Sequence, residues 1–450
     1  MMSDAWAQSL VRELLFRLRD DRLAFQNAVS PQADAIRVAL GSLESASWDE
    51  HTSSQLDVVI HWAYEEMRAS PRADALVLRM LYTDACILRS LGDVLQLGST
   101  QNQVLTMSCV SRLDHAIVIA GAPGERRLDI ILDLILEVQQ RALGFVASSC
   151  DLEHHLDEVR VLSTTASRAL ASAPHQVPRL DSPPSMLAFV RQYSQRPFVI
   201  PRYITDWPAL NEHPWSSLDY LQSMAGPGRV VPVEIGDDYR DDDWTQKMLL
   251  WDDFLDALDP RKQSTREKRK LYLAQHNLFL QFPKLRNDII IPDYAYASLP
   301  APKAFSGYVP PANEEQLVLN VWLGPSDMTS PAHTDPFFNL YAQVVGQKTV
   351  WLAPPQATPA MYPYPPPSGN ASDRTHNPAA NTTNPCMSNT SRVDVFAPRG
   401  SQDEMPLFWE EAVPHAMSVT LEPGDLLFFP PGWWHAMRSE NTSFSVSMWF

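Results

Sequence analysis

Residues 316–352 read QLVLNVWLGPSDMTSPAHTDPFFNLYAQVVGQKTVWL. Three runs in this stretch, Gln316 to Leu323, Leu340 to Val345 and Lys348 to Leu352, are rich in β-branched, aromatic and other apolar residues, and Gly and Pro lie between them. Such runs are typical of short strands bounded by turns. This stretch therefore predicts a β-rich fold rather than a helical one.

The same pattern returns toward the C-terminal end, at Met417 to Leu421, Asp425 to Phe429 and Ser443 to Trp449. Several short strands separated by turns suggest a β-sandwich or barrel, of which the jelly roll is one form. On the N-terminal side, a Pro-rich connector, SAPHQVPRLDSPPS at 172–185, precedes the β-type pattern. Because Pro-rich segments punctuate structure, we place a domain boundary near residue 173.

The N-terminal 173 residues show a helical periodicity, with apolar residues three and four positions apart. Leu10, Leu14, Leu15 and Leu18 are one example of this spacing. Ser-Pro and Gly-Pro breaks divide the region into roughly six predicted helices. The whole chain is thus predicted to be α+β, with a helical domain at 1–173 and a β-rich domain at 174–450. Residues 363–388, rich in Pro, Asn, Ser and Thr, are expected to form a mobile surface insert.

Composition narrows the class of function. Apolar residues make up 45% and charged residues 20%, as in an ordinary globular enzyme. The formal net charge of −17 argues against direct nucleic-acid binding, and a basic peptide or protein suits the surface better. The N-terminus lacks a signal-peptide pattern and no run is long enough to cross a bilayer, so we expect a nuclear or cytoplasmic protein that is not secreted. The sequence does not indicate an oligomeric state.

Two motifs carry candidate metal ligands. His333 and Asp335 are two residues apart, so on an extended chain both side chains point the same way and reach one ion. His435, after the run PPGWW at 430–434, can supply a second imidazole. Two His and one carboxylate on one face of an octahedral ion are the ligand set of non-haem Fe(II) oxygenases. A zinc site with the same ligands is also chemically feasible.

Lys348 and Asn339 follow His333 on strand-like segments with apolar neighbours. A lysine buried there without a partner is costly, and an anionic co-substrate removes that cost. The alternative is an edge-strand lysine whose amine reaches solvent.

At this point the sequence resembles the Jumonji-C oxygenases, and most closely the subgroup called lysine-specific demethylase 8, also described as an arginyl hydroxylase. The resemblance covers about residues 175–450. The segments that carry it are VPVEIGDDYRDDDWTQ (231–246), LYLAQHNLF (271–279), IPDYAYASL (291–299), LNVWLGPSDMTSPAHTDPFFNLYAQVVGQK (319–348), NTSRVDV (389–395) and LEPGDLLFFPPGWWHAMRSENTSFSVSMWF (421–450). The insert at 363–388 is longer than the connector usual in the family.

The resemblance implies a cupin-type double-stranded β-helix, Fe(II) and O₂ as cofactors, and 2-oxoglutarate as co-substrate. It implies that the metal is held by His333, Asp335 and His435, with no catalytic side chain beyond these ligands. It assigns the 2-oxoglutarate site to Lys348, Asn339, Tyr272 and Ser330. It assigns the substrate site to Glu234, Tyr239, Trp244, Trp322 and Trp449. For the helical domain it implies no residue role.

Glu234, Tyr239 and Trp244 lie in a segment crowded with acidic residues. A solvated acidic turn is one interpretation, but carboxylates and aromatic faces are also what a guanidinium binds. We expect an oxygenase that hydroxylates a protein side chain, and favour arginine. Demethylation of a histone N-methyl-lysine is the alternative, since hydroxylating an N-methyl group gives an unstable carbinolamine. A catalytically idle cupin that only binds a partner is the third interpretation.

Overall fold

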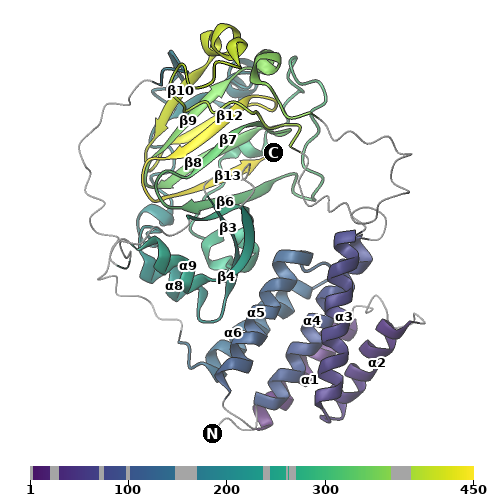
Figure 1. Cartoon of the computed structure of the whole chain (residues 1–450). Coiled ribbons are helices and arrows are strands. Elements are labelled where there is room, and N and C mark those ends of the chain that lie inside the picture. Colours follow the sequence, from purple (N-terminus) through teal and green to yellow (C-terminus); the bar gives the residue numbers. More distant parts are fainter. Residues whose placement is uncertain are drawn as a thin grey trace, which may run out of the picture.

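The computed structural model describes residues 4–20, 30–69, 75–97, 102–146, 170–236, 244–259, 262, 270–365 and 387–450. A helical region lies at one end and two β-sheets lie at the other, with the C-terminus on a strand of the sheets (Figure 1). The predicted combination of an N-terminal helical region and a β-rich cupin-type domain is confirmed.

In the described ranges before residue 147 there are six helices, and the sequence predicted roughly six. The Ser30-Pro31 break begins a helix, because the Ser30 hydroxyl accepts a hydrogen bond from Ala33 N and Pro31 occupies the first turn. Gly121 ends another helix in the left-handed conformation, with φ at 72°. The helices are α1 (Asp4–Asp20), α2 (Pro31–Glu44), α3 (Glu50–Ala69), α4 (Ala75–Leu97), α5 (Gln103–Ala120) and α6 (Arg127–Ala142).

The β-rich region contains two sheets. The larger has eight strands in the order β2-β11-β8-β13-β6-β5-β3-β4, and the smaller has five in the order β1-β10-β9-β12-β7. Their strands are β1 (His175–Gln176), β2 (Phe198–Ile200), β3 (Val230–Ile235), β4 (Thr245–Leu250), β5 (Leu271–His276), β6 (Val318–Gly324), β7 (Thr329–Thr334), β8 (Asn339–Val345), β9 (Lys348–Ala353), β10 (Met417–Leu421), β11 (Leu426–Phe429), β12 (Trp434–Ser439) and β13 (Ser443–Trp449). From β6 to β13 the chain passes from one sheet to the other at every step except from β9 to β10, which are paired neighbours in the smaller sheet, and this is the connectivity of a double-stranded β-helix.

Short helical segments cover the edge of the large sheet nearest the helical region. In Figure 1, α8 and α9 lie together with β3 and β4 between the main body of the sheets and α5 and α6. The short helical segments in the described part of the β-rich region are α7 (Met186–Ala188), α8 (Leu218–Ala225), α9 (Trp251–Leu258), α10 (Leu278–Gln281) and α11 (Pro283–Arg286), with 3₁₀ or π turns at η1 (Phe189–Tyr193), η2 (Pro208–Leu210), η3 (Asp293–Tyr296), η4 (Pro355–Met361), η6 (Phe408–Ala412) and η7 (Val413–His415). Of these, η4 and η6 pack against the smaller sheet instead.

Each of the six predicted strand segments contains a strand, with small shifts at the ends. The run from Gln316 to Leu323 becomes β6, which begins at Val318 and ends at Gly324. The structure also has strands that the sequence did not predict, above all β7. The residues from Thr329 to Thr334 were expected to precede a strand, and they form one themselves. β7 reads TSPAHT and contains a proline, so neither alternation nor composition identifies it.

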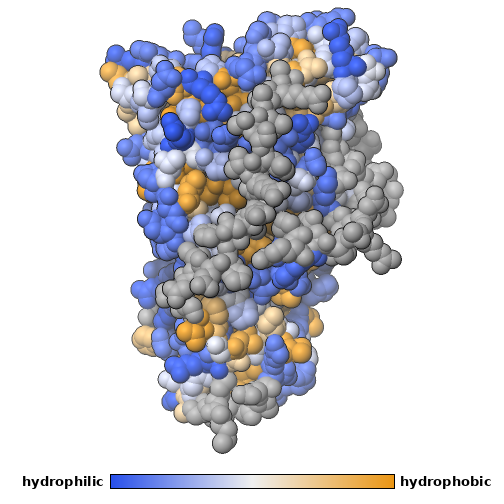
Figure 2. Space-filling model, turned by 90° about the vertical axis from the view of Figure 1, so that its left-hand side faces the viewer, coloured by the Kyte–Doolittle hydropathy of each residue, from blue (hydrophilic) through white to orange (hydrophobic). Residues whose placement is uncertain are grey.

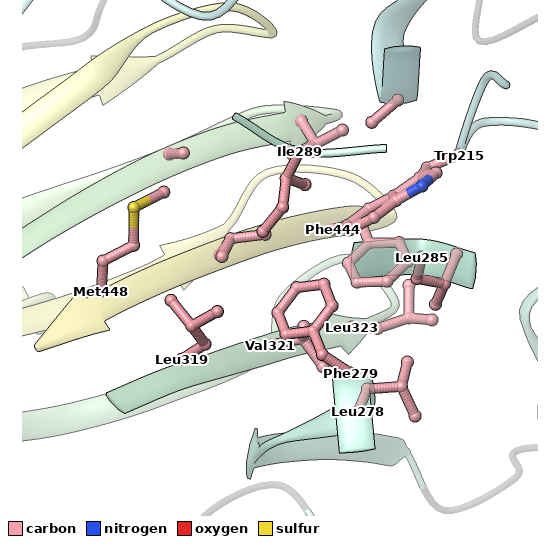
Figure 3. Close-up of a cluster of buried hydrophobic side chains, with 14 of the residues drawn as sticks. Trp215, Leu278, Phe279, Leu285, Ile289, Leu319, Val321, Leu323, Phe444 and Met448 are labelled. Carbon is pink, nitrogen blue, oxygen red and sulfur yellow. The ribbon is translucent and has the colours of Figure 1, made fainter. Parts of the chain in front are cut away.

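The two faces of the large sheet pack against different partners. Leu319, Val321 and Leu323 alternate along β6 on the face that packs against α10 and α11 (Figure 3). Phe444 of β13 lies in the same cluster, with its ring centroid 4.5 Å from that of Trp215. The residues that alternate with Leu319, Val321 and Leu323 along β6 face the smaller sheet, because successive side chains of a strand point to opposite faces. Thus one face builds a hydrophobic core with the helices, and the other builds a second hydrophobic cluster with the smaller sheet, against which the cavity-lining Trp322 packs.

The surface shows no single apolar face in the view of Figure 2, where separate hydrophobic patches lie among hydrophilic residues over both the sheets and the helical region. Among the helices of the described ranges, none is both long enough and apolar enough to cross a membrane.

Candidate metal centre and the cavity beside it

The three predicted metal ligands meet at one point. His333 lies on β7, Asp335 directly after it, and His435 at the start of β12, which pairs with β7 so that His435 is opposite His333. Asp335 Oδ2 is 3.4 Å from His435 Nε2, and its Oδ1 is 3.9 Å from His333 Nε2. The ligand atoms of all three lie within 4.8 Å of one another. Within the described ranges, this is the group of His, Cys, Asp and Glu residues that can hold an ion.

Backbone contacts fix which nitrogen of each histidine faces the ion. His333 Nδ1 is 2.8 Å from Pro331 O, and His435 Nδ1 is 3.1 Å from Trp433 O. A carbonyl oxygen only accepts, so each Nδ1 carries the proton and donates it. Each Nε2 then has a free lone pair directed toward Asp335, which is the tautomer a metal needs.

The protonation states of the site suit a cation. Burial and, second to it, the neighbouring His435 lower the pKa of His333 to about 4, so His333 is neutral at physiological pH. Burial alone would raise the pKa of Asp335, but the two neighbouring histidines outweigh burial and hold it below its usual range. Two imidazoles and one carboxylate therefore face one point.

A cavity of about 400 Å³ opens beside the triad. Eight of the twelve sequence-predicted site residues line it: Glu234, Trp244, Tyr272, Trp322, Ser330, His333, Asp335 and Trp449. His435, Lys348 and Asn339 are buried behind its wall. Tyr239 lies outside the described residues, as do the acidic residues from 237 to 243 and residues 366–386 of the insert.

Lys348 is fully buried on β9, a central strand held between β10 and β12, so the edge-strand interpretation is wrong. Its Nζ lies 3.0 Å from the Tyr341 hydroxyl and 3.4 Å from the Tyr272 hydroxyl. No carboxylate in the described ranges forms an ion pair with it, and burial lowers its pKa to about 7. A buried ammonium with only hydroxyl partners is the position that an anion would stabilise.

Two further buried polar atoms have no hydrogen-bond partner among the described residues. Asn339 is directly opposite Trp449 on the paired strands β8 and β13, and neither Asn339 Oδ1 nor Trp449 Nε1 has a hydrogen-bond partner. Both atoms are buried, and buried polar groups are normally satisfied. Together with Lys348 they fit a polar ligand held between the two sheets.

Glu234 and Trp244 form part of the wall of the cavity. They come from β3 and from the residue that precedes β4, and Trp244 Nε1 donates to Glu234 Oε2 at 3.4 Å. Burial raises the pKa of Glu234 to about 7, and the Trp244 hydrogen bond lowers it in part. Glu234 is also opposite Tyr272 on the paired strands β3 and β5, which joins the two regions of the cavity.

The sequence did not single out several residues that line the cavity. Gln275 has a left-handed backbone with φ at 46°, at an irregularity in the pairing of β5 with β6. Thr390 forms an antiparallel bridge with His333, and Asn389 O accepts a hydrogen bond from Thr334 N at 3.0 Å. Backbone torsion angles and contacts between distant segments leave no periodic signal in the sequence. The segment 389–395 had been noticed only through its resemblance to the family.

The fold and the triad together define the class of protein. Residues 188–450 match the family model described as "Cupin-like domain". The chain belongs to this family, in its Jumonji-C branch of oxygenases, and the His-x-Asp…His triad of the enzymes is present. The triad is consistent with the Fe(II) site typical of that branch.

The relatives extend the similarity into the helical region. The chain is 36% identical to Jumonji C domain-containing protein 5 of Drosophila melanogaster, over 80% of this chain and 82% of that protein. It is 34% identical to lysine-specific demethylase 8 of Danio rerio, over 89% of this chain and 87% of that protein. A match over so much of the chain includes most of the helical region, which the sequence had related to nothing. A Homo sapiens bifunctional peptidase and (3S)-lysyl hydroxylase is 26% identical, over 63% of this chain and 87% of that protein.

Proposed function

We propose that this protein is an Fe(II)- and 2-oxoglutarate-dependent oxygenase that hydroxylates an arginine side chain of a protein substrate. The observation that carries the proposal is a single cavity lined at one side by His333 and Asp335 and at the other by Glu234 and Trp244. One cavity thus offers both a metal site and a site for a cationic side chain.

In this proposal His333, Asp335 and His435 hold the iron through their Nε2 and carboxylate atoms. Iron with 2-oxoglutarate and O₂ supplies the oxidation, in which one oxygen atom enters a substrate C–H bond and the other enters succinate as CO₂ leaves. The protein positions the reactants and excludes water. A triad of two histidines and one carboxylate would leave the remaining positions of the ion open to the reactants.

Lys348 is the proposed partner of the distal carboxylate of 2-oxoglutarate. The buried ammonium has the Tyr272 and Tyr341 hydroxyls beside it, and a carboxylate there accepts hydrogen bonds from all three groups. Ser330 also lines this part of the cavity. The unpartnered Asn339 is a further candidate contact for the co-substrate.

Glu234 is the proposed partner of the substrate guanidinium. Burial raises the pKa of Glu234 because a carboxylate is costly to ionise away from water. A cation that enters the cavity stabilises the ionised carboxylate and so offsets that cost. Trp244 offers an aromatic face beside it, and Trp322 and Trp449 supply aromatic walls nearer to the metal. Tyr239, assigned to the same site by resemblance, has no described position.

The test is to incubate purified protein with Fe(II), ascorbate, 2-oxoglutarate and a pool of synthetic peptides that contain either arginine or N-methyl-lysine. Arginine hydroxylation adds 16 Da to an arginine peptide, whereas demethylation removes 14 Da from a methyl-lysine peptide. We expect the first shift. Succinate formation without either shift across the pool contradicts the proposed substrate but not the oxygenase.

Demethylation of N-methyl-lysine is the second candidate, because several relatives carry the name lysine-specific demethylase. The aromatic walls also accept a methylammonium group by cation–π contact. Arginine is favoured because Glu234 can pair with two guanidinium N–H groups, which a trimethylated lysine does not offer. A binding module without catalysis is not supported, because the ligand set is complete.

A further inference from the structure

A buried aspartate of the helical region is bonded to the catalytic region. Asp114 lies on α5 and is fully buried. Its Oδ1 accepts hydrogen bonds from Arg229 Nη2 at 2.7 Å and Gln281 Nε2 at 2.8 Å, and its Oδ2 accepts from Val230 N at 2.8 Å and Arg229 Nε at 2.9 Å. All of these donors belong to the catalytic region. Such a carboxylate fixes the groups around it, because moving any donor leaves a buried charge less well solvated.

Gln281 relays this contact to a second strand. Its Nε2 donates both to Asp114 and, at 2.9 Å, to Val230 O, while its Oε1 lies 2.6 Å from His276 Nε2. Both partners of Gln281 Nε2 only accept, so the amide has one orientation and His276 must donate from Nε2. Asp114 therefore orders the first residue of β3 and, through Gln281, the last residue of β5.

The same two strands carry the substrate end of the cavity. Glu234 is four residues along β3 from Val230, about 13 Å at the usual rise of a strand. Gln275, whose left-handed backbone lines the cavity, directly precedes His276 on β5. Non-glycine residues keep such a backbone only where the surroundings hold them. Asp114 thus contacts β3 at its first residue and, through Gln281, β5 at its last residue. These two strands carry Glu234 and Gln275 to the cavity.

The helical region also holds the residues that lead into β3. Gln139 of α6 donates from Nε2 to Ala225 O at 3.1 Å and Pro227 O at 2.8 Å. A Cβ added at Gly228, where φ is 84°, would be 3.3 Å from Val110 Cβ of α5, so the segment passes close to this helix. Figure 1 shows α5 and α6 directly beside the β3–β4 end of the large sheet.

We propose that Asp114 is a positioning residue for the protein-substrate pocket, through which the helical region sets the placement of β3 and β5 and so of Glu234 and Gln275. This proposal rests on the proposed function, because its measured effect is on oxidation of an arginine peptide. The iron and 2-oxoglutarate sites are built on β7, β8, β9 and β12, which Asp114 does not contact, with the exception of Tyr272, which lies on β5 four residues before His276. A positioning role therefore affects the peptide far more than the co-substrate.

The test variant is Asp114→Asn, which keeps the size of the side chain and removes its charge. The matched control is Asp84→Asn, since Asp84 is also a buried aspartate of the helical region and pairs with Arg127 at 2.9 Å within that region. Gln139→Met is a second, milder variant that loosens the lead into β3, and it serves if Asp114→Asn does not fold.

The measurement is the KM and kcat for the arginine peptide oxidised fastest in the pool, beside peptide-independent succinate formation at temperatures where every variant is folded. We expect Asp114→Asn to raise the peptide KM at least fivefold, with kcat, the 2-oxoglutarate requirement and peptide-independent succinate formation within twofold of the parent. Gln139→Met shifts the peptide KM in the same direction by less. Asp84→Asn changes none of these values.

The double variant Asp114→Asn with Glu234→Gln tests whether the effect passes through Glu234. Residues that act together are not additive, so we expect the pair to have a peptide KM close to that of Glu234→Gln alone. Equal loss of peptide oxidation and succinate formation in Asp114→Asn, or the same peptide effect in Asp84→Asn, overturns the positioning role. If Glu234→Gln alone leaves peptide oxidation unchanged, the proposed arginine partner fails, and the peptide KM of Asp114→Asn still decides the positioning role.

Discussion

His333 and His435 occupy directly opposite positions on the antiparallel strands β7 and β12, with their ring centroids 4.2 Å apart. Each ring donates from Nδ1 to the carbonyl oxygen two residues before it. The metal site is thus built into a strand pairing, and the backbone sets both rings in the same tautomer. Two histidines held in this way keep their orientation even when no metal ion is bound.

Replacing His333 by Ala is expected to abolish iron binding and turnover while the fold persists. His333 is neutral and contributes little to a core that β7 and β12 already form. Iron content of the purified variant and succinate formation measure the loss, and a thermal melt measures the fold. His415→Ala, at an exposed histidine away from the cavity, is the control. Succinate production at the parent rate in His333→Ala would contradict the assignment.

Lys348→Ala should raise the 2-oxoglutarate requirement far more than Lys348→Arg, because the distal carboxylate loses a buried cationic partner, a change of about 3–5 kcal/mol. The measured quantity is the 2-oxoglutarate concentration that gives half-maximal succinate formation. Unchanged requirements in both variants would show that Lys348 has a structural role only.

Lys348 also makes the stability of the ligand-free protein depend on pH. Burial lowers its pKa from 10.5 to about 7, so between these values the unfolded chain binds a proton that the native state does not. This contribution to stability therefore rises with pH from about 7 to 10.5. Lys348→Met removes it, and urea unfolding at pH 7 and pH 9 should show a smaller pH difference for the variant than for the parent.

Peptide binding should strengthen as the pH rises through about 7, because the guanidinium pairs with ionised Glu234, whose pKa burial raises to that value. Peptide KM is measured from pH 6 to pH 8.5 beside peptide-independent succinate formation, which reports pH effects at Lys348 and the metal site. Glu234→Gln should lose the pH dependence specific to the peptide and cut peptide hydroxylation at least tenfold, since charged hydrogen bonds are worth roughly 1.5–3 kcal/mol. A pH profile that is the same in parent and variant rules out Glu234 as the partner.

Gly324→Ala is expected to weaken 2-oxoglutarate binding although no polar group is removed. A Cβ at Gly324 would clash with the ring of Tyr272, whose hydroxyl lies beside Lys348 Nζ. The ring has to move, and the 2-oxoglutarate requirement should rise severalfold. Gly307→Ala is the matched control, because an added Cβ there meets no atom within 4 Å. Equal behaviour of the two variants would show that the Tyr272 position does not affect the co-substrate.

The sequence by itself determined the class of fold and the metal ligands. Alternating apolar runs predict strands because one face of each must be buried, and the spacing of His333 and Asp335 follows from the two-residue repeat of a strand. The cost of burying a lysine among apolar residues singled out Lys348, and resemblance then supplied Glu234 and Trp244. The structure places Glu234 and Trp244 on one cavity and buries Lys348 with its amine beside the Tyr272 hydroxyl.

Only the tertiary structure decided how these residues meet. The pairing of β7 with β12, the left-handed backbone of Gln275 and the burial of Lys348 between central strands depend on contacts between segments far apart in the chain. The same holds for Asp114, which in the sequence is one polar residue on a helix. Its role in the fold arises because folding brings Arg229, Val230 and Gln281 to its carboxylate, and local sequence does not encode that proximity.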